Sequence, residues 1–425
     1  MRVVVVGGGL AGLAAALDLV DTGADVTLVE ARPTLGGAVQ TLPERAGDPA
    51  PPPDNGQHVA LGCCSEYLTF LQRIGSRGSI RRLRLRLPVI AEDGSVGLLG
   101  AGPVALLAYR HLSFGERIGV ARIARRLGAL EPDLHDGETF AGLLRRFGST
   151  QTAIDRFWDV FIRPALNLRA EEASAALGIF TVQTALLGPR EASDLLLPIA
   201  PLGEMHGDAA GRALEAAGAS VRLRTRAATL DGTSVVTTDG ERLDAGAIVL
   251  AVSAAECAAL LGDPAPRLGD SPIVSVHLLF DAPILEPPLA ALLASPAHWV
   301  FDRGRLTGQP PARGQYLTVV ASGAPELAAT RGKELVELVA SALTERLGHA
   351  ELLWSRVSRE PEATFAGRPG TGSRRPGVET PRANVVRAGT WTRTGWPATM
   401  EGAIRSGRSA ARAVLTVPAG ALQSV

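Results

Sequence analysis

Three glycines near the amino terminus have the spacing of a loop that binds a diphosphate. Gly7, Gly9 and Gly12 follow one another as G-x-G-x-x-G. In such a loop the first glycine permits a tight turn, the second lets the backbone approach the phosphates, and the third lets a helix pack closely on a strand. Glu30 follows where a carboxylate accepts hydrogen bonds from an adenosine ribose and repels a 2′-phosphate. The spacing therefore predicts a bound dinucleotide.

The residues around these glycines predict the elements that would position them. Residues 3–6 are a β-branched run typical of a buried parallel strand, and a helix is expected over 10–22. This helix would direct its free N–H groups and the positive end of its dipole at the phosphates. A second strand is expected over 25–29. A secretory signal would instead need a small-residue cleavage site after the apolar run, so export is rejected.

A segment near the carboxyl end, residues 389–412, also suits a ligand site. It reads GTWTRTGWPATMEGAIRSGRSAAR, and Pro397 favours an extended chain at its centre. Ala398 and Thr399 are small enough for the backbone to pass beside a flat ring. A helix is expected over 401–412, with its first turn facing the ligand.

Gly36 and Gly37 lie just past the acid and would bring a second piece of backbone against the diphosphate. Together with the fingerprint, this pair resembles the amine oxidase and phytoene desaturase class of FAD proteins. Where that class commonly has an arginine after the two glycines, this chain has Ala38, and where it has Gly-Asp, this chain has Gly389 and Thr390. The lost carboxylate is expected to weaken flavin binding without abolishing it, because one hydrogen bond contributes about 0.5–1.5 kcal/mol.

Residues 219–253 form short alternating strands that by themselves indicate only a β-meander, with an apolar strand over 247–252. The resemblance implies that this region returns to the nucleotide domain and that the backbone near Arg226 and Ala227 meets the adenine. The cofactor-binding residues expected from the motifs and the resemblance are Gly7, Gly9, Leu10, Ala11, Gly12, Glu30, Ala31, Arg32, Gly36, Gly37, Ala38, Ala227, Gly389, Thr390, Pro397, Ala398 and Thr399.

The stretch DNGQH, residues 54–58, narrows the resemblance. With FWDVFIRPALNLRAEEASA at 157–175 and GWPATMEGAIRSG at 395–407, it is similar to squalene-associated FAD-dependent desaturase-like proteins, which include hydroxysqualene dehydroxylases. The match runs the whole length of the chain. The resemblance implies reductive removal of the hydroxyl of hydroxysqualene, giving squalene for hopanoid biosynthesis, with NADPH or another external reductant as electron donor.

That reaction needs an acid, because hydroxide is a poor leaving group. His58 is the best candidate within DNGQH, since an unperturbed imidazole has a pKa of about 6.5. Asp54 would orient His58 or belong to the flavin pocket, and Asn55 and Gln57 would bind the hydroxyl. The catalytic residues expected are therefore His58, Asp54 and Gln57, although His58 that only hydrogen-bonds backbone is an open alternative.

Five other polar residues are weaker candidates. Glu204 and His206 lie in a turn and are interpreted as solvated, while Asn167 and Arg163 are expected to fix a turn between helices. The carboxylate of Glu401 is already explained by the dipole of its own helix.

The predicted fold is α/β, with a discontinuous Rossmann-like FAD-binding domain and an inserted α+β substrate domain. The FAD-binding domain is expected to comprise 1–60, 200–270 and 370–425, and the substrate domain 61–199 and 271–369. Helical patterns over 115–169 and 326–347 suggest a helical cover on a small sheet, and the alternation RRLRLRL over 81–87 indicates one strand.

An isoprenoid lipid substrate requires an apolar tunnel and contact with a bilayer surface, so the expected location is cytoplasmic and peripheral on the inner face of the cell membrane. The segment 115–130 suits a basic interfacial helix, with a solvated face as the alternative. Its arginines and neighbouring apolar residues are Arg117, Arg122, Arg125, Arg126, Ile118, Ile123 and Leu127.

Composition limits the partners. Lys plus Arg and Asp plus Glu are both 43, so no overall charge favours nucleic acid. Cys63, Cys64 and Cys257 have no metal-binding spacing and are expected as buried free thiols of a reducing compartment. No apolar run reaches the roughly 18 residues that span a bilayer.

Three other functions stay open from the sequence. A carotenoid or squalene desaturase would keep the flavin and reverse the redox sense. An amine oxidase is less favoured, because only 4% of the residues are aromatic and such enzymes prefer an aromatic cage. A non-enzymatic prenyl-lipid escort protein would explain Thr390 and Ala38 as signs of a degenerate flavin site.

Overall fold

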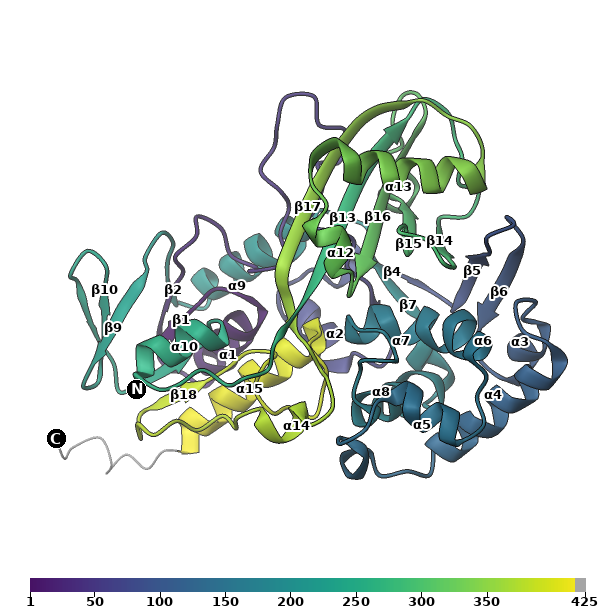
Figure 1. Cartoon of the computed structure of the whole chain (residues 1–425). Helices are drawn as coiled ribbons and strands as arrows, with labels where there is room; N and C mark the ends of the chain where they lie inside the picture. The colour runs from purple at the N-terminus through teal and green to yellow at the C-terminus, as the bar shows by residue number, and fades with distance from the viewer. Residues whose placement is uncertain (417–425) are drawn as a thin grey trace.

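The computed structural model describes residues 1–416 and contains a five-stranded parallel sheet at its amino-terminal end (Figure 1). The order β18-β12-β1-β2-β8 places β1 at the centre, between β2, the next strand in the chain, and β12, which follows much later. The predicted strand-helix-strand opening is confirmed. The strands are β1 (Arg2–Val6), β2 (Asp25–Val29), β8 (Ser220–Arg222), β12 (Ala247–Leu250) and β18 (Val385–Arg387).

Both faces of this sheet are covered, which explains the unbroken β-branched run of β1. Val3 and Val5 belong to a core shared with four helices, whereas Val4 and Val6 face a core shared with a three-stranded antiparallel sheet and one helix. The four helices are α1 (Leu10–Asp21), α2 (Ser65–Arg73), α9 (Ala209–Ala216) and α15 (Met400–Thr416). The opposite layer comprises β9 (Ala227–Asp231), β10 (Ser234–Thr237), β11 (Arg242–Asp244) and α10 (Ala254–Leu261).

A seven-stranded mixed sheet forms the second half of the molecule, in the order β17-β13-β16-β15-β14-β5-β6. Its strands are β5 (Arg86–Ile90), β6 (Val96–Gly100), β13 (Asp270–Phe280), β14 (Leu289–Leu292), β15 (Trp299–Asp302), β16 (Gln315–Ser322) and β17 (Leu352–Phe365). Helices α12 (Pro325–Ala329) and α13 (Gly332–Leu347) pack on it and correspond to the single helical pattern expected over 326–347. Figure 1 shows β13 and β17 running from this sheet toward α15.

Short helices cover the remaining side of the molecule, as the pattern over 115–169 predicts. They are α3 (Pro103–Ala108), α4 (Phe114–Leu127), α5 (Phe140–Arg146), α6 (Gln151–Ala153), α7 (Asp159–Leu166) and α8 (Ala175–Thr181). A small sheet, β3 (Ala60–Leu61), β7 (Leu195–Pro198) and β4 (Ile80–Leu83), lies beside them. Single helical turns complete the chain: η1 (Arg77–Ser79), η2 (Pro132–His135), η3 (Ile154–Trp158), η4 (Val182–Leu186), η5 (Arg190–Ser193), η6 (Gly203–Asp208), α11 (Arg303–Thr307) and α14 (Thr371–Arg374).

The prediction of one strand over 81–87 is wrong. The chain leaves β4 after Leu83 and enters β5 at Arg86, and the two strands belong to different sheets. Period-2 alternation specifies an extended backbone with two faces, but it does not specify which strand becomes the hydrogen-bonding partner.

Three segments within the predicted FAD-binding ranges supply the parallel sheet. The boundaries chosen from the sequence stay a prediction, and residues 417–425 of the last range lie outside the described residues. The three cysteines are free thiols, although Cys63 is only half-buried. No helix within residues 1–416 has both the length and the apolar character needed to cross a membrane.

Candidate functional site

The glycine loop at the end of β1 contains two glycines that the fold itself requires. Gly7 has φ +105°, and a Cβ there would lie 2.3 Å from the carbonyl oxygen of Ala251. A Cβ on Gly12 would lie 1.9 Å from the carbonyl oxygen of Gly7. Both positions therefore exclude any side chain, whether or not a ligand is bound.

Gly9 is different and tests whether the site fits a dinucleotide. Its backbone is extended, with φ −75°, and a Cβ there would have the Cα of Gly37 as its nearest neighbour at 3.9 Å. Nothing in the described chain excludes a side chain from this position. No side chain of residues 1–416 caps α1 either, so its first N–H groups remain available. These features fit the diphosphate of FAD lying against the backbone.

The second glycine pair and the acid surround the same loop. Gly36 donates its N–H to the carbonyl oxygen of Gly8 at 2.8 Å, which places the two glycine segments in contact. The carboxylate of Glu30 accepts the N–H of Gly8 and that of Arg32, both at 2.7 Å. Glu30 thus holds the loop in place and keeps lone pairs for a ribose.

The segment expected to meet the adenine, near Ala227, is joined to the segment of Glu30 by backbone hydrogen bonds. The N–H of Thr225 donates to the carbonyl oxygen of Glu30 at 2.9 Å, and that of Arg224 donates to the carbonyl oxygen of Arg32 at 3.1 Å. Ala227 begins β9 directly afterwards and is half-buried. The structure therefore brings the segment of Ala227 beside Ala31 and Arg32, at the far side of the glycine loop.

A cavity of about 350 Å³ extends from these loops toward the second sheet. The end of the cavity nearest the glycine loops is called the cofactor end below. It is lined by Leu10, Gly36, Ala38 and the start of α15. Aliphatic and aromatic side chains make up most of the remaining wall: Leu61, Leu85, Leu87, Leu99, Val160, Phe161, Leu195, Ile273, Trp299, Phe301 and Val320. Of the described residues that line the cavity, His58 and Glu360 alone are ionisable. Such a wall accepts a hydrocarbon chain.

The predicted carboxyl-terminal segment contributes to the cofactor end. Thr390, Ala398 and Thr399 line the cavity, whereas Pro397 lies behind its wall. The N–H of Gly389 donates to Ser406 Oγ of α15 at 2.6 Å, which ties the segment to its helix.

Arg375 fixes the same segment and was not identified from the sequence. Its guanidinium is buried and donates to the carbonyl oxygens of Thr390, Thr392 and Trp396. Burial lowers the pKa of Arg375 to about 10. A single arginine thus joins three carbonyl groups of an irregular loop.

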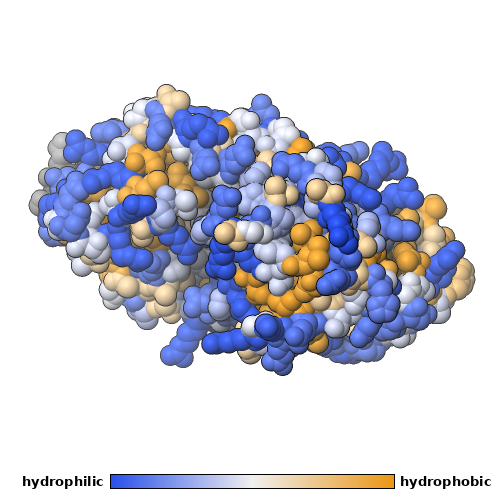
Figure 2. Space-filling model, turned by 90° about the horizontal axis from the view of Figure 1, so that it is seen from above, coloured by the Kyte–Doolittle hydropathy of each residue, from blue (hydrophilic) through white to orange (hydrophobic). Residues whose placement is uncertain are grey.

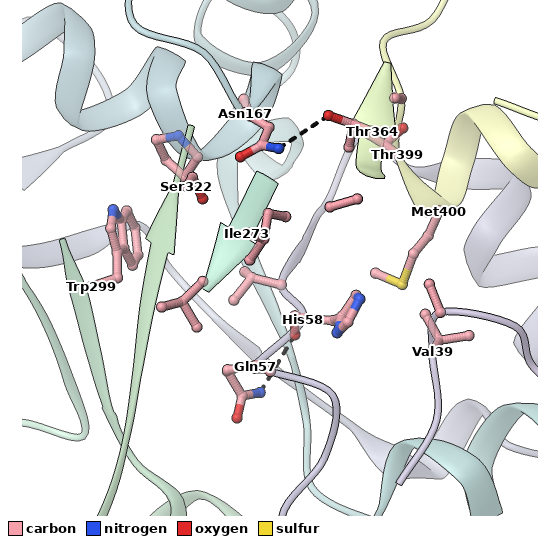
Figure 3. Close-up of a pocket in the computed structure, with 18 of the residues that line it drawn as sticks. Val39, Gln57, His58, Asn167, Ile273, Trp299, Ser322, Thr364, Thr399 and Met400 are labelled. Atoms are coloured by element: carbon pink, nitrogen blue, oxygen red, sulfur yellow. Dashed lines mark hydrogen bonds between the residues drawn. The ribbon is translucent and has the colours of Figure 1, made fainter. Parts of the chain in front are cut away.

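His58 faces the cavity from the DNGQH stretch. Figure 3 shows its ring directed toward Met400 and Val39, at the cofactor end, while the amide of Gln57 points away from that ring. Nδ1 of His58 is buried and has no hydrogen-bond partner among residues 1–416. Burial lowers the pKa of His58, and the charge of Asp54 opposes this shift only in part. The ring of His58 is therefore less readily protonated near neutrality than the sequence predicts.

Asp54 lies behind the cavity rather than in its wall. Its carboxylate pairs with Arg303 at 2.8 Å and accepts hydrogen bonds from Thr41 Oγ1 at 2.7 Å and the N–H of Leu202 at 3.0 Å. These bonds join the DNGQH stretch to α11, which directly follows β15 of the second sheet, and to the loops that contain Thr41 and Leu202. The geometry does not support the expectation that Asp54 orients His58 through a hydrogen bond.

Asn167 and Arg163 tie α7 to the second sheet, and Asn167 also forms the turn that ends α7, as expected. Asn167 ends α7 with φ +52° and lines the cavity, and its Nδ2 donates to the carbonyl oxygen of Ser271 and to Thr364 Oγ1 (Figure 3). Arg163 donates to the carbonyl oxygens of Ser322 and Gly323.

His206 and Glu401 also need correction. His206 is fully buried and bonds to the hydroxyl of Tyr67 at 2.9 Å, and burial lowers its pKa to about 4; only Glu204 is solvated as expected. Glu401 accepts the N–H groups of Glu66 and Tyr67, so it caps α2 rather than serving only its own helix.

Comparisons with known proteins agree with this geometry. A family model described as "Flavin containing amine oxidoreductase" matches residues 10–415. The chain is 27% identical to a hydroxysqualene dehydroxylase of Sinorhizobium fredii, covering 97% of this chain and 98% of the relative. It is 26% identical to a probable zeta-carotene desaturase of Synechococcus elongatus, covering 99% of each. Cyclohexylamine oxidase from Brevibacterium oxydans has the same fold, with a TM-score of 0.72 at 19% identity over 97% of this chain and 98% of that one.

Proposed function

The chain belongs to the flavin-containing amine oxidoreductase family, and from this membership we propose that it removes the hydroxyl of hydroxysqualene to give squalene. Membership of this family makes the chain an FAD-dependent oxidoreductase, which disfavours the lipid-escort alternative. The observation that carries the finer proposal is the apolar cavity that meets the cofactor loops and holds only two ionisable side chains. Such a wall suits a C30 hydrocarbon with a single polar group.

The residues of this chain would divide the work of the reaction. The glycine loops and the start of α15 would hold FAD, which in its reduced form would supply a hydride to carbon. The leucine and phenylalanine wall excludes water and holds the isoprenoid chain. His58 lines the cavity at the end nearest the glycine loops, so its imidazolium form would donate a proton to the departing hydroxyl oxygen.

A product assay tests the proposal. The flavin-loaded protein is incubated without oxygen with hydroxysqualene and a chemical reductant, and the lipid extract is analysed by mass spectrometry. We expect squalene. A conjugated polyene formed in the absence of squalene would instead support a desaturase, which the similarity to zeta-carotene desaturases favours as the second candidate.

We further propose that one end of the molecule contacts a lipid bilayer. None of the residues of α3 is buried; Val104 is 81% exposed, and Phe114 at the start of α4 is 70% exposed. Figure 2 shows hydrophobic side chains among polar ones at the corresponding end of the molecule. Leu99 of the neighbouring β6 lines the cavity, so this apolar end adjoins the route of a lipid substrate.

The charges on α4 also fit the proposed contact of this end with a bilayer. Arg122 and Arg125 are exposed on α4, and neither makes an ion pair within the described residues. Ile123 and Leu127, which the sequence analysis placed beside these arginines at the interface, face the core instead. An apolar tip flanked by unpaired arginines is complementary to an anionic bilayer surface.

A further inference from the structure

The side chain of Glu360 lines the cavity, and its carboxyl group has no role in the proposed function so far. It is half-buried on β17, opposite Ile273 of β13. Its Oε1 accepts a hydrogen bond from Nδ2 of Asn55 at 2.9 Å. No basic side chain of residues 1–416 forms an ion pair with it, so Glu360 is not a member of a structural salt bridge.

The pairing of the sheet is irregular beside Glu360. The pairing of β13 with β17 shifts register between Ser271 and Ile273, beside Glu360. Pro361 follows directly and cannot donate a ladder hydrogen bond, and β17 is the edge strand where a proline is tolerated. Bulges of this kind change the direction of a side chain and are frequent next to active sites.

Asn55 fixes Glu360 at the cofactor end of the cavity. The same Nδ2 donates to the carbonyl oxygen of Ala38, the residue after the second glycine pair, at 3.1 Å. Oδ1 of Asn55 accepts the hydroxyl of Ser358, also on β17. The half-buried Glu360 is thus held beside the cofactor loops in an otherwise apolar wall, with one amide hydrogen bond to its Oε1.

We propose that the carboxylate of Glu360 stabilises the positive charge that develops on the isoprenoid carbon during hydride transfer. The proposal rests on the proposed isoprenoid chemistry. In dehydroxylation the C–O bond breaks, the oxygen leaves with the electron pair and takes the proton of protonated His58 to form water, and the hydride supplied by reduced flavin forms the C–H bond. NADPH or another two-electron donor then restores the reduced flavin. Partial positive charge builds up on the allylic carbon in this step.

The carboxylate of Glu360 would have the same role in a desaturation, in which the substrate is oxidised. In desaturation the carbon loses a hydride to oxidised flavin and the neighbouring carbon then loses a proton, so positive charge again develops beside Glu360. The inference therefore depends on an isoprenoid substrate but not on the direction of the reaction.

Binding of a cationic lipid tests this role without turnover. The flavin-loaded protein is titrated by calorimetry with farnesyl-dimethylamine, which is protonated at neutral pH, and with the uncharged hydrocarbon in which carbon replaces nitrogen. We expect the wild type to bind the amine at least about tenfold more tightly, because hydrogen bonds to charged groups are the stronger ones. Glu360→Gln keeps an oxygen that can accept from Asn55 and should lose this preference. Glu362→Gln changes an exposed carboxylate two residues away and should retain it.

Two results would overturn the proposal: a wild type without preference for the amine, or a Glu360→Gln variant that keeps the full preference. If Glu360→Gln loses its flavin, Glu360→Asp preserves the charge and should keep part of the preference. The product assay separates this inference from the proposed function. An amine preference without squalene formation contradicts only the dehydroxylase proposal, and squalene formation without an amine preference contradicts only the role of Glu360.

Discussion

Gly9 and Gly12 belong to one motif, yet the structure gives them different reasons to be glycine. A Cβ on Gly12 collides with the backbone of Gly7, whereas a Cβ on Gly9 makes only an ordinary contact of 3.9 Å with the Cα of Gly37. The motif predicts both roles from spacing alone. Glu360 and Arg375 could not be found in this way, because their roles depend on a bulge and on an irregular loop whose partners lie far away in the sequence.

A substitution at Gly9 should separate cofactor binding from folding. We expect Gly9→Ala to leave the stability of the flavin-free protein within about 0.5 kcal/mol of the wild type, because its backbone is extended and the Cβ has room. Flavin affinity should fall, because the new methyl group occupies the approach of the diphosphate. Urea unfolding and titration with FAD measure the two effects.

Gly12→Ala is the matched control and should lower stability itself, since its Cβ would lie 1.9 Å from a carbonyl oxygen. Unchanged flavin affinity in Gly9→Ala would contradict the placement of the diphosphate.

The pH dependence of turnover should report on His58. Burial lowers its pKa below the ordinary value of about 6.5, so the imidazolium is a minor species at pH 7 and increases as the pH falls. Dehydroxylation should therefore accelerate as the pH is lowered from 8 through 6.5, without levelling at 6.5. His58→Gln should remove this dependence and lower kcat by about 10²–10⁴ while flavin absorbance persists. A variant with the wild-type profile would exclude His58 as the acid.

At the scale of elements, local sequence patterns predict the helices and strands well, but they do not predict which elements pack or pair together. β1, α1 and β2 follow from β-branched runs, glycine and helical periodicity within thirty or so residues. The switch of the chain from β4 to β5 and the capping of α2 by α15 depend on tertiary contacts, for which the sequence has no local signal. The cofactor loops were therefore predictable, whereas most of the cavity wall was not.

Glu401 should contribute to stability by joining two helices. It is fully buried and accepts the N–H of Tyr67 at 2.7 Å and that of Glu66 at 3.1 Å, while Arg405 pairs with it at 2.8 Å. We expect Glu401→Ala to lower the free energy of unfolding by about 1–3 kcal/mol, because buried donors lose their acceptor. Urea unfolding measures the change.

Glu256→Ala is the comparison, because Glu256 is an exposed acid in the first turn of α10. This substitution should lower the free energy of unfolding by less than Glu401→Ala does. Equal losses in the two variants would contradict the capping role.

At the scale of the whole molecule, the cavity wall extends from the cofactor loops to β6, which lies beside the apolar tip that we propose as a bilayer contact. The cavity begins at the glycine loops and its wall includes Leu99 of β6, whose neighbour Leu98 is exposed on the outer side. Composition predicts neither feature, because the net charge is zero and the exposed apolar residues are spread over several elements.

Membrane binding should depend on this tip. Flotation with vesicles of phosphatidylcholine and phosphatidylglycerol should recover the wild type, and the double variant V104E and L107E should bind at least tenfold more weakly, because each apolar side chain contributes roughly 1.5–3 kcal/mol when buried. Arg122→Glu should weaken binding mainly at low salt. Leu338→Glu on α13 alters an exposed leucine elsewhere and should bind as the wild type does. Equal flotation of all variants would contradict the proposed surface.

The central place of β1 in the parallel sheet has a consequence for biosynthesis. β1 leaves the ribosome long before its neighbour β12, which begins only at Ala247, and before α15, which begins only at Met400. At about 5–20 residues per second, tens of seconds separate the two sides of the nucleotide pocket. The nascent chain must keep an open sheet edge from aggregating throughout this interval, and flavin can be captured only once α15 has been synthesised.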